Sequence, residues 1–293
     1  MDLRTDSEFS SLIFFNQEQP CAYHTKDQGR LSSDVDGLFT DVYTICPHTA
    51  EWNNKVLNDD QEKFKPLLFP IDKEYLLDSS NKRWDTVFYG SVCGRDHAEA
   101  VDIISKFKYR FMTLGYEYWN PNEKLDDIEK TASFVTDINL HDNVPVNRKN
   151  VHTFEKWKIL SETKVLPIYN QLYLHDSHVE NIKKYERWHE NKAWTHLDEK
   201  IAPQLKPRVT EAALFKMLML VKRDPWNLIE YWFEPGKDFI YFDSNDELEE
   251  LIKETTTNLD KYQHIVESAY AKALENYTTE ALFDRMITNR KKK

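Results

Sequence analysis

Short apolar runs, rich in β-branched and aromatic residues, alternate along this chain with longer amphipathic stretches. The short runs have the length of buried strands, and the longer stretches repeat their apolar residues at helical spacing. Strands separated by helices run parallel, because a crossover through a helix returns the chain to the same edge of the sheet. The pattern therefore predicts an α/β protein built on parallel sheets.

The expected elements cover most of the 293 residues. Strands are predicted at Leu12–Asn16, Asp41–Cys46, Pro66–Pro70, Asp85–Gly90, Tyr109–Gly115, Ser133–Asp137, Lys164–Asn170, Met217–Lys222 and Asp238–Asp243. Helices are predicted to begin near His48, Arg95, Thr153, Ser177, Arg208, Trp226 and Asn245. From Asn258 onward the apolar spacing predicts helix almost throughout, before a frayed lysine tail.

The polar segment from Asp72 to Arg83 interrupts the run of strands and predicts a domain boundary. We expect a small N-terminal domain over residues 1–80, with about three strands, and a larger domain over residues 81–260. Residues 261–293 are expected to form C-terminal helices that pack back across both domains.

Composition and charge exclude several classes of protein. The 39 Lys and Arg residues against 50 Asp and Glu residues give a net charge of −11, which disfavours nucleic acid as a partner. We see no export signal and no stretch apolar enough to span a bilayer. Three widely spaced cysteines argue against a disulfide framework and a zinc cluster, so we expect a cytoplasmic protein.

Most familiar catalytic motifs are absent from the sequence. None of the six glycines forms Gly-x-Gly-x-x-Gly, a Walker A loop or Gly-x-Ser-x-Gly. His189-Glu190 begins like a zinc-protease helix, but Ala193 stands where the second histidine would be. Asp34-Val35-Asp36 has the spacing of a metal-binding acidic motif of sugar transferases, yet its neighbours are typical of a turn or a helix cap.

Two segments suggest a site for an anion. In the first, the strand before Gly90 ends in a tight turn with Ser91, and Arg95 opens the next helix. Backbone N–H groups and a cation then converge on the carboxyl end of the sheet, as a diphosphate requires. An ordinary strand-to-helix turn, with Arg95 in a surface ion pair, remains the alternative.

In the second segment, Arg208 and Glu211 are three residues apart and share the first turn of a predicted helix. A cation at a helix N-terminus opposes the helix dipole, which favours an arriving anion, and the carboxylate can accept bonds from two ribose hydroxyls. A capped helix with a simple ion pair is the alternative interpretation.

Between Arg208 and about Arg285 three motifs precede the trailing helices: Arg208-Val209-Thr210-Glu211-Ala212-Ala213, then Arg223-Asp224-Pro225-Trp226-Asn227, then Phe233-Glu234-Pro235-Gly236-Lys237-Asp238-Phe239-Ile240-Tyr241-Phe242. In their order and spacing this part of the chain resembles the C-terminal half of GT-B glycosyltransferases of the group-1-like and CgeB-like types, including those of large DNA viruses of algae (chloroviruses). Gly90-Ser91, Arg95 and the segment 164–170 fall where that family places its donor-side loop and a later strand.

The resemblance implies a GT-B-like fold of two Rossmann-like domains, the N-terminal one reduced, and transfer of a sugar from a nucleotide diphosphate to a hydroxyl of a glycan or glycoprotein. A UDP-sugar donor is favoured, UDP-xylose being one candidate. Glu211 would hold the ribose, Arg208 and Arg95 the diphosphate, Gly90 and Ser91 would supply backbone donors, and Asn170 would line the pocket. In this fold arginines and backbone dipoles commonly replace a metal, so we expect no metal and no other cofactor.

The acceptor side departs from the family, because only about three strands fit before residue 80. Within it, His24 is a candidate base, with Asp27 or Asp36 as the group that orients it or substitutes for it. His48 is the rival candidate, and a surface loop histidine is the alternative for His24. The reduced domain also leaves open a homodimer that completes the acceptor site.

Two other functions remain open at this point. One is a non-catalytic protein that binds a nucleotide sugar or a glycan and derives from a transferase. The other is a nucleotide-sugar epimerase or a phosphorylase on a related two-domain scaffold.

If the chain is viral, its compartment would be the host cytoplasm.

Overall fold

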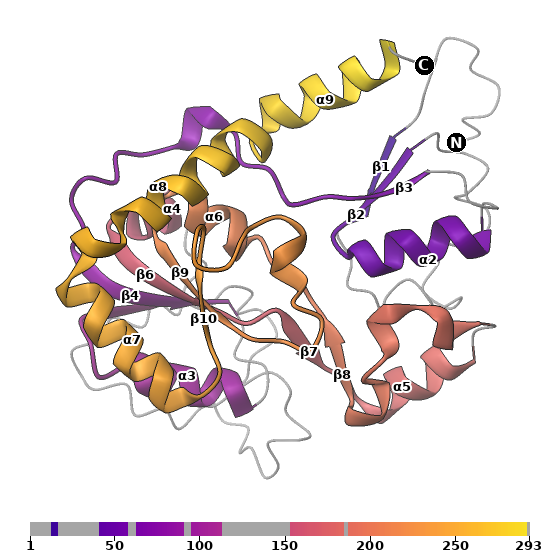
Figure 1. Cartoon of the computed structure of the whole chain (residues 1–293), viewed down its shortest axis with the longest axis horizontal. Helices are drawn as coiled ribbons and strands as arrows, with labels where there is room; N and C mark the ends of the chain where they lie inside the picture. The colour runs from indigo at the N-terminus through magenta and orange to yellow at the C-terminus, as the bar shows by residue number, and fades with distance from the viewer. Residues whose placement is uncertain are drawn as a thin grey trace. The chain divides into compact units, whose positions relative to one another are not determined.

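The computed structural model describes residues 13–16, 41–57, 63–90, 95–112, 153–184 and 187–291. The chain divides into two compact units (Figure 1). The first unit comprises residues 1–68 and 170–206, and the second comprises residues 69–169 and 207–293.

A small parallel sheet forms one part of the first unit. Its order is β1-β2-β3, with β1 at Ile13–Asn16, β2 at Asp41–Thr44 and β3 at Phe64–Pro66. Helix α2 (Pro47–Leu57) connects β2 to β3. The Asn54 amide binds both backbone groups of Phe64, at 2.7 and 2.8 Å, and so fixes the helix against the third strand.

The rest of the first unit is a hairpin-like pair of short strands with helices around it. Strands β7 (Gln171–Tyr173) and β8 (Ile201–Pro203) pair antiparallel, and α5 (Asp176–Lys183) and three short 3-10 helices (188–190, 192–194 and 197–199) lie between them. The Trp52 indole of α2 donates to the Arg187 carbonyl at 3.1 Å, and Cys46 packs into the core of this part. Residues far apart in sequence therefore complete one unit.

The second unit contains a parallel five-stranded sheet in the order β10-β9-β6-β4-β5. The strands are β4 (Trp84–Tyr89), β5 (Tyr109–Met112), β6 (Thr163–Ile168), β9 (Leu218–Lys222) and β10 (Ile240–Phe242). From β4 the chain adds β5 on one side and then β6 on the other. The order thus reverses between β4 and β6, and open α/β sheets bind ligands beyond the carboxyl ends of strands at such a switch point.

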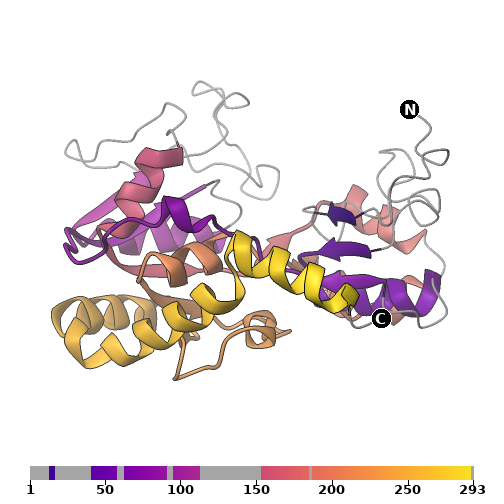
Figure 2. The ribbon, with the colours of Figure 1, turned by 90° about the horizontal axis from the view of Figure 1, so that it is seen from above.

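The described helices of the second unit are α3 (Arg95–Ile104), α4 (Thr153–Ser161), α6 (Arg208–Leu214), α7 (Asn245–Thr257), α8 (Leu259–Asn276) and α9 (Thr279–Lys291), with 3-10 turns at Lys73–Tyr75 and Leu228–Tyr231. Of these, α3, α6, α7 and α8 pack against strands of the sheet. Helix α7 packs against α3 (Figure 1) and against α8 (Figure 2). The buried cluster joins strand residues such as Phe88, Val165 and Leu220 to apolar residues of α3, α7 and α8.

The α/β class with parallel sheets is confirmed, and most expected elements are present within a few residues of the expected position. The third strand lies at Phe64–Pro66 rather than 66–70, and a 3-10 turn at Leu228–Tyr231 replaces the helix expected near Trp226. Strands β7 and β8 were not expected, because three residues are too few to show a period. The strand expected at 133–137 lies outside the described residues.

The compact units do not follow the three segments expected from the sequence. Residues 170–206 join the first unit, although the expected boundary placed them in the larger domain, and α9 is assigned to the second unit. Local composition marks breaks in a chain, whereas a segment that returns to an earlier domain is recognised only by its contacts.

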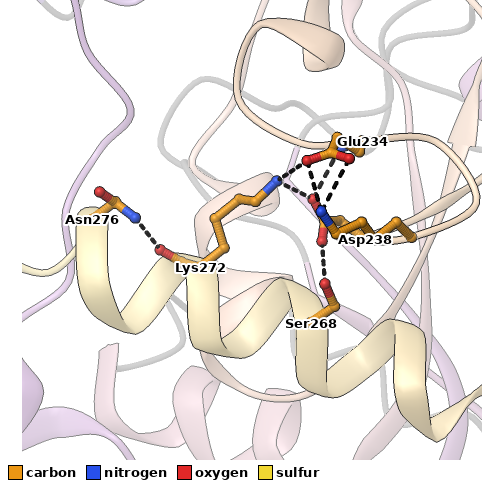
Figure 3. A network of polar contacts seen from close by, with 6 residues as sticks. Glu234, Asp238, Ser268, Lys272 and Asn276 are labelled. Atoms are coloured by element: carbon orange, nitrogen blue, oxygen red, sulfur yellow. Dashed lines mark hydrogen bonds and ion pairs between the residues drawn. The ribbon is translucent and has the colours of Figure 1, made fainter.

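A buried polar network holds the β9–β10 connection to α8 (Figure 3). The Asp238 carboxylate has no exposed area and accepts bonds from the Lys272 ammonium, from the Ser268 hydroxyl at 2.6 Å and from the Glu234 N–H at 2.9 Å. Glu234 also pairs with Lys272, at 3.3 Å, and with Lys237, at 2.9 Å. Burial alone would raise the pKa of Asp238, but the bonds from Lys272, Ser268 and Glu234 lower it below its ordinary value.

We expect Asp238→Ala to lower the free energy of unfolding by about 3 kcal/mol, because the network loses its shared acceptor. The exposed Lys237→Ala control should change it by about 0.5 kcal/mol or less. The pKa of Asp238 is lower in the folded state than in the unfolded chain. Asp238 therefore contributes its full stabilisation at pH values above its unfolded-state pKa, and this stabilisation is lost as the pH falls below about 4. Denaturant unfolding at neutral and acidic pH measures this. A difference in unfolding free energy between the wild type and Asp238→Ala that stays the same in acid would contradict this role of Asp238.

Candidate active site

The carboxyl end of β4 and the start of α6 meet at Gly90. This glycine has φ +97°, a conformation that L side chains rarely adopt, and a Cβ placed there would lie 2.5 Å from Nη2 of Arg208. The Arg208 guanidinium donates to the Tyr89 carbonyl and lies over the Phe88 and Tyr89 rings, 5.0 and 5.2 Å from their centroids. Glycine is therefore required here both for its backbone and for the space that the guanidinium fills.

Three residues further along α6, Glu211 occupies the centre of a buried polar cluster. Its Oε2 accepts a hydrogen bond from the Tyr89 hydroxyl at 2.6 Å, and its Oε1 pairs with the Lys156 ammonium of α4. The side chains of Lys156 and Glu211 are 13% and 7% exposed. The Lys156 ammonium also lies 4.8 Å from the centre of the Tyr89 ring. Two cations, one carboxylate and one phenol thus share a site beside β4.

The protonation state of Tyr89 follows from its surroundings. Burial, and then the neighbouring Glu211 carboxylate, raise the pKa of Tyr89 well above its ordinary value, against the smaller opposing effect of Arg208. The phenol therefore stays protonated and donates to Glu211, which remains the acceptor for both Tyr89 and Lys156.

Helix α6 is buried over all seven of its residues, Arg208 and Glu211 included. Alanines at 212 and 213 let the helix approach the sheet closely. Charged groups are rarely buried unless they are paired, so a helix that buries two of them in its first turn must hold partners for both. The partners come from β4 and α4, which fixes the relative position of the three elements.

The structure brings together Gly90, Arg208 and Glu211, as the sequence suggested. Arg95 is the first residue of α3, which follows β4, and its side chain lies outside what the structure describes. Asn170 follows β6 and is assigned to the first unit, where its carbonyl accepts from the Gln204 N–H at 2.8 Å. Its buried side-chain amide has no partner among the described residues.

The remaining expected residues fall outside the described ones: Ser91, His24, Asp27 and Asp36. The rival base, His48, lies in the first turn of α2. Burial and the Lys192 charge lower the pKa of His48 below its ordinary value, and Glu51 opposes them. The lowered pKa keeps the imidazole neutral and able to accept a proton.

Sequence reasoning missed Lys156 and Tyr89. Lys156 is one of two lysines in an unremarkable amphipathic helix, and only the order of the strands shows that this lysine faces Glu211. Tyr89 was visible as the last residue of β4, directly before Gly90, and that position was the signal available.

Within the described part of the chain, no three His, Cys, Asp or Glu residues gather closely enough to hold a metal ion. Among the described helices, none combines the length and the apolar character needed to cross a bilayer.

Comparison with known proteins places this arrangement in context. Residues 147–288, slightly less than half of the chain, match the family model described as glycosyl transferase-like. No curated protein matches the chain.

Solved structures that share its architecture include the following three. A glycosyltransferase from Rickettsia africae has 10% identity and a TM-score of 0.53, over 96% of this chain and 70% of that one. HepE of Anabaena, solved with UDP and glucose, has 9% identity and a TM-score of 0.60, over 97% and 72%. Sucrose-phosphate synthase from Thermosynechococcus elongatus has 10% identity and a TM-score of 0.52, over 96% and 67%.

The chain has a GT-B fold. The expected fold class is thereby confirmed, and the Gly90–Arg208–Glu211 cluster lies at the carboxyl edge of the β4-containing sheet of that fold.

Two glycines of the second unit allow the close approach to be tested. Gly236 also has a positive φ, +73°, but a Cβ there would meet nothing within 4 Å. We expect Gly236→Ala to lower the free energy of unfolding by about 1–2 kcal/mol through backbone strain alone. Gly90→Ala should cost clearly more, because the methyl group also displaces the Arg208 guanidinium. Equal losses in denaturant unfolding would show that Arg208 does not fill the space beside Gly90.

Proposed function

We propose that this protein is a glycosyltransferase that moves a sugar from a UDP-sugar to a hydroxyl of a glycan or glycoprotein. The observation that carries the proposal is the convergence of Arg208, Lys156 and Glu211 beside Gly90 at the topological switch of a parallel sheet. The glycosyl transferase-like family match over residues 147–288, which contain both cations and the carboxylate, supports it.

In the proposed reaction the bond between the anomeric carbon and the diphosphate oxygen breaks, and the diphosphate leaves with the electron pair. The acceptor oxygen forms the new bond to the anomeric carbon and passes its proton to a base. Negative charge develops on the leaving diphosphate, so preorganised cations there lower the barrier most. Arg208 and Lys156 are the described cations suited to this role, and Arg95, at the start of α3, is the third that we assign to it.

Glu211 is proposed to hold the ribose. Each of its oxygens already accepts one bond, from Tyr89 or from Lys156, and a carboxylate oxygen has room for a second. Ser91 and the Gly90 backbone are assigned to the diphosphate, and Asn170 to the wall of the pocket. A UDP donor is favoured because HepE, which shares the fold, was solved with UDP and with UDP-glucose. UDP-xylose remains our candidate within that class.

His24, oriented or replaced by Asp27 or Asp36, is the base that we propose, with the neutral His48 as its rival. We propose a reaction that needs no metal, since cations of the chain neutralise the diphosphate. We also retain as proposals a cytoplasmic location, an algal-virus origin and a homodimer that completes the acceptor side.

Arg208→Ala and Glu211→Ala should each weaken UDP binding by about 1–3 kcal/mol, because each removes a charged hydrogen-bonding group from the donor site. Isothermal titration with UDP and with UMP measures the effect, and the Arg208 variant should lose most of the preference for the diphosphate. Arg83 directly precedes the first residue of β4, at the end of the strand away from Gly90. Arg83→Ala is the matched control and should bind UDP as the wild type does. Wild-type affinity in both site variants would remove these residues from the donor site.

The proposed base is tested by His24→Ala, with His48→Ala beside it. We expect turnover to fall about 10²- to 10⁴-fold in the variant that lacks the base, with little change in UDP affinity. Release of UDP from a panel of UDP-sugars, with and without glycan acceptors, is the readout. Full activity in both variants would place the base elsewhere. Binding without turnover in the wild type would favour a nucleotide-sugar binding protein.

A further inference from the structure

Lys82 lies two residues before β4 and bonds to the ends of two helices. Its ammonium donates to the carbonyl of Ser161, the last residue of α4, at 3.0 Å. It also donates to the carbonyl of Phe215, the residue after α6, at 2.9 Å. Carbonyls at a helix C-terminus lack intrahelical partners and carry partial negative charge, so one cation here satisfies both helix ends.

The two helices that Lys82 joins are the ones that carry the candidate donor site. Lys156 precedes Ser161 by five residues, about 7.5 Å along α4, and Glu211 precedes Phe215 by four, about 6 Å along α6. The helices therefore meet at two levels, through the Lys156–Glu211 ion pair and through Lys82. The Trp157 ring of α4 also contacts the Phe215 ring, with 6.3 Å between the centroids.

We propose that Lys82 is a positioning residue, which sets the distance between Lys156 on α4 and Arg208 and Glu211 on α6 and thereby shapes the donor site. The inference rests on the function proposed above. Lys82 touches none of the three site residues in the described contacts, so it acts through the two helices rather than on the donor.

The surroundings of Lys82 make its positive charge costly. Burial, and then the nearby Lys216 ammonium, lower the pKa of Lys82 to about 7, and Asp78 opposes them. Lys216 is itself paired with Glu267 at 3.0 Å. Lysines with a lowered pKa occur at functional sites and in structural networks alike, so the proposal stands on the two helix-end bonds of Lys82.

The test uses the full chain in four forms: wild type, Lys82→Met, Lys82→Arg and Lys158→Met. Lys158 is an exposed lysine on α4 and serves as the matched control. Hydrogen–deuterium exchange is followed in peptides that cover 153–161 and 208–216, with 245–257 as the internal reference. UDP affinity is measured by calorimetry in parallel.

We expect Lys82→Met to speed exchange about tenfold in the two site helices but not in α7, and to raise the Kd for UDP about tenfold. Lys82→Arg, which keeps the cation and its donors, should restore both values to within about threefold, and Lys158→Met should match the wild type.

Three results would overturn the inference: exchange unchanged in α4 and α6, exchange raised equally in α7, or UDP affinity unchanged while exchange rises. A wild type that does not bind UDP would count against the proposed function instead. The exchange data would then decide by themselves whether Lys82 couples α4 to α6.

Discussion

The close approach of the Arg208 guanidinium to the backbone at Tyr89 and Gly90 is the contact on which the rest of the second unit depends. It requires a glycine with a positive φ at the end of β4 and a helix whose small residues let it lie against the sheet. With Arg208 in this position, Glu211, three residues later in the same helix, lies beside the Tyr89 hydroxyl and the Lys156 ammonium. The geometry of the candidate site is thus a consequence of how β4, α4 and α6 pack.

Burying this cluster has an energetic cost that the packing must offset. Arg208, Glu211 and Lys156 are largely removed from water. The cost of burying each charge is offset only because each has a charged or carbonyl partner. Lys82 extends the same principle to the far ends of the helices, where two carbonyls share one ammonium. We interpret this pattern as preorganisation for an anionic ligand, since a site with fixed cations needs little rearrangement when a diphosphate binds.

The sequence predicted the parallel α/β pattern and that Gly90, Arg208 and Glu211 lie near one another. Each of these leaves a local mark: a strand that stops at a glycine, and a cation with a carboxylate in one helical turn. Lys156 and Lys82 leave no such mark. Their importance comes from partners 55 to 133 residues away, which only the order of the strands brings near. The same reason explains why residues 170–206 were not expected to complete the first unit.

A crystal structure of the protein with UDP tests the central claim most directly. The account predicts a diphosphate beyond the carboxyl end of β4, within hydrogen-bond distance of the Arg208 guanidinium and the Lys156 ammonium, with the ribose toward Glu211. Density for UDP at any other place, with the Arg208–Glu211 cluster left untouched, would contradict it.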